Sequence, residues 1–240
     1  MKNSREYAAV LGKLLRRVRR ELGAPVEPEK TDLITELALA CLSQYASENK
    51  AQSALTKLRN HFVDFNELRV CRESEVSRIL GTTYPKARDT ANLLVRSLRA
   101  IFDRQDVLNL DVLNTMGKRE AKTYLEEFEE IPHYVVARIM LRGLGGHAFP
   151  VNEKMLEVLR AEEAVDEKAD EADVQGFMER QIAAKDMLKQ YVLLREHADQ
   201  FEAKRNRTKK RTVTKKKTAT KKKTSTRKKA TRKTTSKSKK

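Results

Sequence analysis

The residues from Phe128 to Asn152 read FEEIPHYVVARIMLRGLGGHAFPVN. They predict a turn, then a helix with apolar residues at helical spacing, then a break at Gly145 and Gly146 and an extended Phe149–Val151 segment. Asn152 is of a residue type that often caps the N-terminus of a helix. The stretch therefore predicts a helix, a loop and the start of a further helix.

The same stretch resembles the centre of the helix-hairpin-helix DNA glycosylases, the endonuclease III superfamily. Those proteins carry a hairpin Leu-Pro-Gly-Val-Gly-x-Lys-Thr-Ala, a helix, and then Leu-Gly-x-Pro-Ala-Phe-Pro-Val-Asp, in which the lysine and the aspartate are the catalytic pair. Residues 144–151, LGGHAFPV, keep most of the last segment. The aspartate position holds Asn152, and the lysine position, eighteen residues earlier, holds Tyr134.

The hairpin has also changed. In the family, the amides of its two glycines approach a DNA phosphate, and here those positions hold Glu130 and Pro132. Proline has no amide hydrogen, and a glutamate repels phosphate. The family's lysine forms a Schiff base, which the phenol of Tyr134 cannot do, and Asn152 cannot supply the negative charge of the aspartate. The resemblance thus implies a retained scaffold with two degenerate catalytic positions, Tyr134 and Asn152.

Two further segments are similar to the family and supply candidate DNA-binding residues. Residues 42–47, LSQYAS, resemble a Leu-Ser-Gln-x-x-Ser/Thr segment whose glutamine fills the space left by a flipped nucleotide, which implies a DNA contact for Gln44. Residues 83–87, TYPKA, resemble a Gly-x-Tyr-x-x-Lys-Ala segment with shorter spacing, and they add Tyr84 and Lys86. The alternative is an ordinary helix end for Gln44 and an ordinary helix start for the other two.

Residues 1–203 have the composition of a helical domain. Apolar residues recur at helical spacing, Gly and Pro are sparse, and no Val/Ile/Thr run alternates as in a strand. We therefore predict an all-α class, and the resemblance implies a two-lobed helical HhH-GPD glycosylase-like fold with a DNA cleft between its lobes. Within it we expect a helix over 5–22, a helix capped near Thr31, and an exposed acidic loop from Glu162 to Asp173.

The polar face of the helix expected over 5–22 is basic. It carries Arg16, Arg17, Arg19 and Arg20. Such a face is either simply solvated or in contact with phosphates.

Residues 204–240 form a second, basic segment. They hold 20 Lys and Arg and no Asp or Glu, which leaves residues 1–203 with a net charge of −3 out of a total of +17. Almost nothing in the segment is apolar, so burial cannot offset its chain entropy, and we predict a disordered tail similar to those of histone H1-like and other nucleoid-associated proteins. Its candidate DNA contacts are Lys215, Lys216, Lys217, Lys221, Lys222, Lys223, Arg227, Lys228 and Lys229.

The cysteine count limits the cofactors. Most endonuclease III relatives hold a [4Fe–4S] cluster on four cysteines, and this chain has only Cys41 and Cys71. Its four histidines show no metal-ligand spacing, so we predict no iron–sulfur cluster, no metal and no other cofactor. No apolar run reaches about 18 residues and no signal peptide is recognisable, so we expect a cytoplasmic, nucleoid-associated protein that binds no membrane.

Three functions follow from these observations. The first is a catalytically inactive DNA-binding protein on a scaffold related to base-excision repair proteins, with the tail supplying most of the affinity. The second is an active DNA glycosylase without lyase activity that uses Glu129 or Glu130 in place of the aspartate. The third is a protein-interaction module that the tail tethers to DNA. We prefer the first, because both catalytic residues of the family are replaced.

Overall fold

Every regular element in the part of the chain that the computed structural model describes, residues 4–26, 29–201 and 203, is a helix. The predicted all-α class is confirmed. Among these residues, none of the helices combines the length and the apolar composition that crossing a bilayer requires. The residues up to Asp199 belong to one compact unit. The predicted tail from 204 to 240, with its candidate lysines and arginine, lies outside the described residues, and the boundary predicted at residue 203 stays a prediction.

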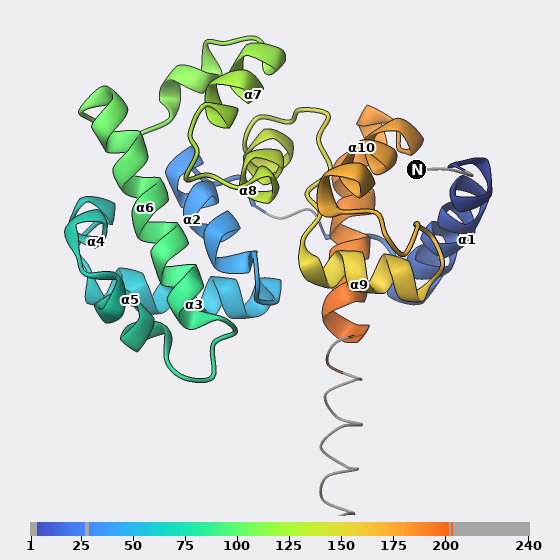
Figure 1. The fold of residues 1–240 in the computed structure, drawn as a ribbon, viewed down its shortest axis with the longest axis horizontal. Helices are drawn as coiled ribbons and strands as arrows, with labels where there is room; N and C mark the ends of the chain where they lie inside the picture. Colours follow the sequence, from blue (N-terminus) through green and yellow to red (C-terminus); the bar gives the residue numbers. More distant parts are fainter. Residues whose placement is uncertain (1–3, 27–28, 202, 204–240) are drawn as a thin grey trace, which may run out of the picture. The chain divides into compact units, whose positions relative to one another are not determined.

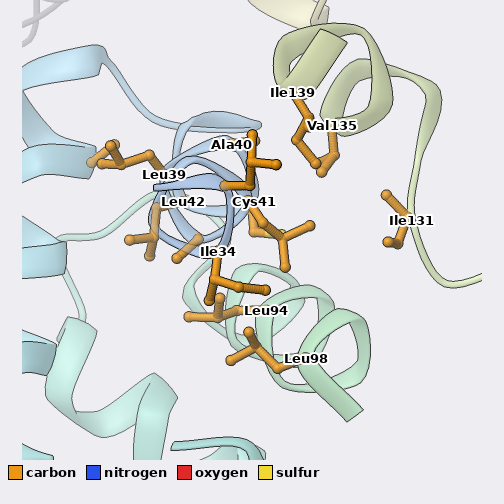
Figure 2. Close-up of a cluster of buried hydrophobic side chains, with 14 of the residues drawn as sticks. Ile34, Leu39, Ala40, Cys41, Leu42, Leu94, Leu98, Ile131, Val135 and Ile139 are labelled. Atoms are coloured by element: carbon orange, nitrogen blue, oxygen red, sulfur yellow. The ribbon is translucent and has the colours of Figure 1, made fainter. Parts of the chain in front are cut away.

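The first of two hydrophobic cores surrounds the helix α2. All eleven residues of α2 are buried, and α2 packs against α3, α6 and α8. A helix that is apolar all round belongs at the centre of a bundle. Figure 2 shows side chains of α2 beside Leu94 and Leu98 of α6, with Val135 and Ile139 also lining the cluster. The elements of this lobe are α2 (Leu33–Ser43), α3 (Glu48–His61), α4 (Phe65–Val70), α5 (Glu73–Leu80), α6 (Ala87–Gln105), η1 (Asp111–Asn114), α7 (Lys118–Glu126) and α8 (His133–Arg138).

The second core is formed by the first helix of the compact unit together with its last helices. Its elements are α1 (Ser4–Leu22), α9 (Glu153–Ala161), α10 (Glu171–Gln181), η3 (Ala184–Asp186) and a last helix that begins at residue 187. Leu11, Leu14 and Val18 of α1 pack there with Leu159 and Phe177. In Figure 1, α2 to α8 gather in one group and α1, α9 and α10 in another. The two lobes expected from the resemblance are therefore present as two separate cores.

The segment from Tyr134 to Asn152 joins the lobes. Helix α8 continues into a π-helical turn, η2 (Ile139–Gly143), which the sequence pattern does not predict. Gly145 then takes a φ of 63°, and the amide of Gly146 donates to the carbonyl of Met140 at 2.7 Å. A Cβ at position 146 would lie 3.1 Å from that carbonyl oxygen, so both residues suit glycine. Asn152 then caps α9, as predicted, by accepting from the Met155 amide at 3.1 Å.

Two local predictions are wrong. The cap of α2 is Asp32 instead of Thr31, because the Asp32 carboxylate accepts from the Thr35 amide at 2.8 Å. The acidic stretch from Glu162 to Asp173 is not a loop throughout, since α10 begins at Glu171. Apolar residues within that stretch also anchor it to the second core, namely Ala164, Val165 and Ala169.

Candidate functional site

Tyr134, at the family's lysine position, lies inside the protein. Its side chain comes from the first turn of α8 and is 2% exposed. The phenol shares a hydrogen bond of 2.9 Å with the Ser43 hydroxyl and one of 3.4 Å with the Tyr191 phenol. These three residues come from α8, the end of α2 and the last helix. Tyr134 therefore ties the first lobe to the second.

The charges around the two phenols separate their pKa values. Burial disfavours the phenolate of Tyr134, but the guanidinium groups of Arg195 and Arg138 outweigh it and lower the pKa of Tyr134. Burial, and then the neighbouring Tyr134, raise the pKa of Tyr191 well above its usual value. The phenol of Tyr134 carries no amine, so it cannot form an imine with a sugar.

Asn152, at the family's aspartate position, forms hydrogen bonds inside the protein through both its Nδ2 and its Oδ1. Asn152 is 0% exposed, and its Nδ2 donates to the carbonyls of Ser43 at 3.3 Å and Gln44 at 3.1 Å. Its Oδ1 accepts from the Met155 amide. Carbonyl groups at the C-terminal end of a helix have no partner within the helix, and the Nδ2 of Asn152 donates to two of them at the end of α2. A carboxylate, which only accepts, could not make these two bonds.

A buried ion-pair network surrounds Arg138. This arginine is 0% exposed, and its guanidinium donates to Glu36 at 2.7 Å, to both carboxylate oxygens of Glu48 at 2.7 Å and to the Ser43 hydroxyl at 2.8 Å. Arg142 adds contacts of 3.3 Å to Glu36 and 2.9 Å to Glu48. Burial opposes ionisation of Glu48, but Arg138 outweighs it and holds the pKa of that carboxyl well below its usual range. The network joins α2, α3, α8 and η2.

Gln44, the predicted DNA probe, lies at the end of α2, as the sequence predicts. The residue is 6% exposed, and its Oε1 is buried without a hydrogen-bond partner. Nearby, the Nη2 of Arg195 donates to the carbonyls of Ser43 at 3.1 Å and Ala46, while its Nε and Nη1 have no hydrogen-bond partner. In this structure Gln44 is enclosed at the junction of the lobes, where Asn152 holds its backbone.

Tyr84 packs against the core in this structure, and its assignment as a DNA contact stays a prediction. Tyr84 is 9% exposed, and its phenol donates to the carbonyl of Leu42 at 2.7 Å. That carbonyl belongs to the last turn of α2 and has no partner within the helix. The sequence segment therefore marks a capping interaction here.

Lys86 remains at the surface. It has a left-handed φ of 46°, and its ammonium group lies 2.7 Å from the Glu153 carboxylate and 4.4 Å from the centre of the Tyr45 ring. Lys86 also lines an open groove of about 990 Å³ between α5 and the start of α6. Most of the residues that line the groove are polar or charged, and they include Ser74, Ser77, Arg78, Thr82, Arg88 and Asn92.

The proposed substitutes for the aspartate do not join this site. Glu129 is exposed in the turn before α8, and Glu130 is half-buried there. Among the described residues, neither carboxylate is hydrogen-bonded to Tyr134 or Asn152. An acid that replaces the catalytic aspartate must be within reach of the reacting atoms.

Both cysteines are free thiols with raised pKa values. Burial raises the pKa of Cys41 to about 12, and partial burial together with the Glu75 carboxylate raises that of Cys71 to about 11. Neither is poised to react as a thiolate at neutral pH. Within the described residues, no three His, Cys, Asp or Glu side chains are grouped in a way that could hold a metal ion.

The network around Arg138 was not predicted from the sequence, although the sequence carries a signal for it. Glu36 interrupts the apolar run LITELALACL, and Arg138 interrupts YVVARIML. A charged residue in an otherwise buried helix needs a partner of opposite charge. Two such residues of opposite sign are therefore candidates for pairing.

No protein-family model matches the chain, and its sequence matches none of the curated proteins. Its structure is similar to that of endonuclease III in a trapped covalent intermediate with DNA, with a TM-score of 0.60 and 10% identity over 81% of this chain and 85% of that one. It is similar to Clostridium acetobutylicum 8-oxoguanine glycosylase/lyase in complex with DNA, with a TM-score of 0.60 and 16% identity over 81% and 70%. It is also similar to H. pylori 3-methyladenine DNA glycosylase, with a TM-score of 0.54 and 12% identity over 85% and 99%. The chain therefore has the helical fold of endonuclease III and related HhH-GPD DNA glycosylases.

Proposed function

We propose that this protein binds DNA on a glycosylase-type scaffold without excising bases. The observation that carries the proposal is that both positions of the family's catalytic pair are used to hold the protein together. Tyr134 is hydrogen-bonded to Ser43 and Tyr191, and Asn152 is hydrogen-bonded to the end of α2 and the start of α9. Neither side chain has a polar atom free to meet a nucleotide.

The chemistry at these two positions supports the same conclusion. Base excision builds positive charge on the sugar, and a nearby carboxylate that stabilises such a charge contributes several kcal/mol, about 3 in typical cases. Asn152 has no charge, and the groups nearest to Tyr134 include the cationic Arg138. The carboxylates near this place, those of Glu36 and Glu48, are already paired with Arg138 and Arg142, so they offer no free negative charge to a developing cation. The site is therefore electrostatically unsuited to the family's reaction.

The support for DNA as the partner comes from the fold and the charge. The similar structures of endonuclease III and 8-oxoguanine glycosylase/lyase are complexes with DNA. The segment from 204 to 240 carries 20 positive charges and no acidic residue, which suits phosphate contacts that do not read bases. In this proposal the protein is a pseudoenzyme that associates with the cytoplasmic nucleoid and needs no iron–sulfur cluster.

The test is an activity assay run beside a binding assay. The full chain is incubated with duplexes that contain uracil, thymine glycol, 8-oxoguanine or an abasic site, with endonuclease III as the positive control. Alkali after the reaction reveals base release without strand cleavage, and borohydride traps an imine. We expect binding of every duplex, no alkali-labile site and no trapped adduct. Base release by the purified chain would refute the inactive assignment, and failure to bind any duplex would leave a protein-interaction module as the better reading.

A further inference from the structure

The outer face of α1 is a concentrated basic surface. At about 100° per residue, five of its six cations fall within an arc of about 120° opposite the buried stripe of Leu11, Leu14 and Val18. Neither acidic residue of the helix, Glu6 or Glu21, falls in this arc. The face, called here the α1 basic face, consists of Arg5, Lys13, Arg16, Arg19 and Arg20.

The charges of the α1 basic face are not neutralised within the described part of the chain. All five side chains belong to exposed residues, and none of them forms an ion pair there. Arg17, on the flank of the helix, differs from them: it is half-buried and contacts Glu162 at 2.6 Å and Glu21 at 3.8 Å. The face also contains the small residues Ala9 and Gly12, which leave room for close approach. Residues 1–203 carry a net charge of −3, so these five unpaired cations form a local patch of opposite sign.

We propose that the α1 basic face is a second phosphate-binding surface, separate from the tail, that lies along the backbone of duplex DNA. This inference rests on the proposed function, because it concerns the same partner. The face runs about 22 Å along the helix axis, from Arg5 to Arg20 at 1.5 Å per residue. Duplex DNA presents about one negative charge for every 1.7 Å of its axis. Cations distributed over this length can therefore meet several phosphates without reading a sequence.

The packing of α1 argues for a nucleic acid over a membrane. An amphipathic helix that binds a bilayer inserts a free apolar face among the lipids. The apolar stripe of α1 is already buried in the second core, where Leu11 packs with Leu14, Val18 and residues of α9 and α10. Only the cationic side remains accessible, and it can attract phosphates but has nothing apolar to insert.

The experiment compares two quadruple variants of the full chain. The test variant is K13Q/R16Q/R19Q/R20Q, and the control variant, K50Q/K57Q/K168Q/K185Q, removes the same charge from exposed lysines scattered over other elements. Glutamine has nearly the helix propensity of lysine and arginine, so both variants should fold. Binding to an undamaged duplex is measured over a range of salt concentrations. Each phosphate contact contributes about 0.9 to the magnitude of the slope of log K against log salt. The magnitude of this slope should therefore fall by up to about 3.6 in the test variant and by less than about 1 in the control variant.

The outcomes separate this inference from the proposed function. Equal slopes in the two variants would overturn the inference while the unmodified chain still bound DNA. An unmodified chain without DNA affinity would overturn both. Vesicles that contain acidic phospholipid serve as the remaining arm. If the test variant lost vesicle binding relative to the control but kept its DNA affinity, the face would belong to a lipid surface and the inference would be wrong.

Discussion

Replacing Asn152 by Asp restores the family's residue, yet we expect it to destabilise this protein. The new carboxyl keeps the cap of α9, because it can still accept from the Met155 amide. It loses the two bonds from Nδ2 to the carbonyls of Ser43 and Gln44 and places an oxygen against them. Ser43 keeps Arg195 as a donor, but the Gln44 carbonyl loses its donor.

The magnitude follows from these contacts. Each lost hydrogen bond costs about 1 kcal/mol, and a buried acceptor without a donor costs about 1–3 kcal/mol. The interaction of the new negative charge with the N-terminus of α9 offsets about 0.3–1 kcal/mol of this loss. We expect a net loss of about 2–4 kcal/mol at pH 7, which corresponds to roughly 4–16 °C in Tm for a unit of this size. Urea unfolding and thermal unfolding, both followed by circular dichroism, measure it.

The pH dependence of this loss is a sharper test than its size. Burial raises the pKa of a carboxyl, so the folded variant holds its proton to a higher pH than the unfolded chain does. The part of the penalty that comes from the charge is therefore absent below the unfolded pKa of about 3.9 and is complete once the pH has risen through the folded pKa. The loss of one of the two donors remains at every pH, because a neutral carboxyl has a single O–H. The difference from the unmodified protein should shrink between pH 7 and pH 4. Asn152→Ser, which keeps a helix cap without a charge, should be destabilised by the same amount at pH 7 and at pH 4. Undiminished stability of Asn152→Asp at pH 7, or a deficit that does not change with pH, would refute the reasoning.

The remaining predictions concern binding and acid stability. Gln44→Ala should weaken binding to an abasic duplex more than to an intact one, if DNA draws this side chain into the gap of a distorted site. If a fluorescence titration showed the same loss of affinity on both duplexes, or no loss, Gln44 would be an ordinary helix end. Deleting Lys204–Lys240 should reduce the magnitude of the salt slope by about 7 if about eight phosphates are engaged, and should leave Tm nearly unchanged because both cores end before residue 200. Full affinity of the truncated chain would place the main binding surface on the helical domain. Glu48 has a lowered pKa, so the stability it contributes is complete above the ordinary glutamate pKa of 4.5 and is lost as pH falls towards the lower folded pKa. Glu48→Gln should therefore flatten the acid side of the stability profile, and an unchanged profile would contradict the role given to the Arg138 network.

The sequence was informative about the fold where periodic patterns repeat. The helix α1, the cap by Asn152 and the loop at Gly145 and Gly146 all follow from local residue preferences. The π-helical turn η2 does not, because its extra residue per turn changes no apolar pattern over so short a length. Thr31 and Asp32 are both good caps, and only the hydrogen bond to the Thr35 amide distinguishes them.

The site was predicted less well because its residues are far apart in the chain. The positions of Tyr134 and Asn152 came from the resemblance, but their partners Ser43 and Tyr191 lie 91 and 57 residues from Tyr134. Tyr84 illustrates the same limit: the motif that contains it predicts a DNA contact, but nothing in that motif indicates the hydrogen bond of its phenol to a carbonyl 42 residues away. Hydrogen bonds between distant side chains depend on tertiary packing, which a local pattern does not encode.

The contact between Tyr134 and Tyr191 also provides an optical signal. The chain contains six tyrosines and no tryptophan, so its near-ultraviolet circular dichroism comes mainly from tyrosine and phenylalanine. Two of the six tyrosines meet at the junction of the lobes, with their hydroxyls 3.4 Å apart in an asymmetric, rigid environment. Any partner that separates the lobes would break this pair and change the tyrosine bands. Titration of the unmodified, unlabelled protein with DNA, with the DNA's own bands in this range subtracted, can thus report whether binding opens the molecule or leaves it closed.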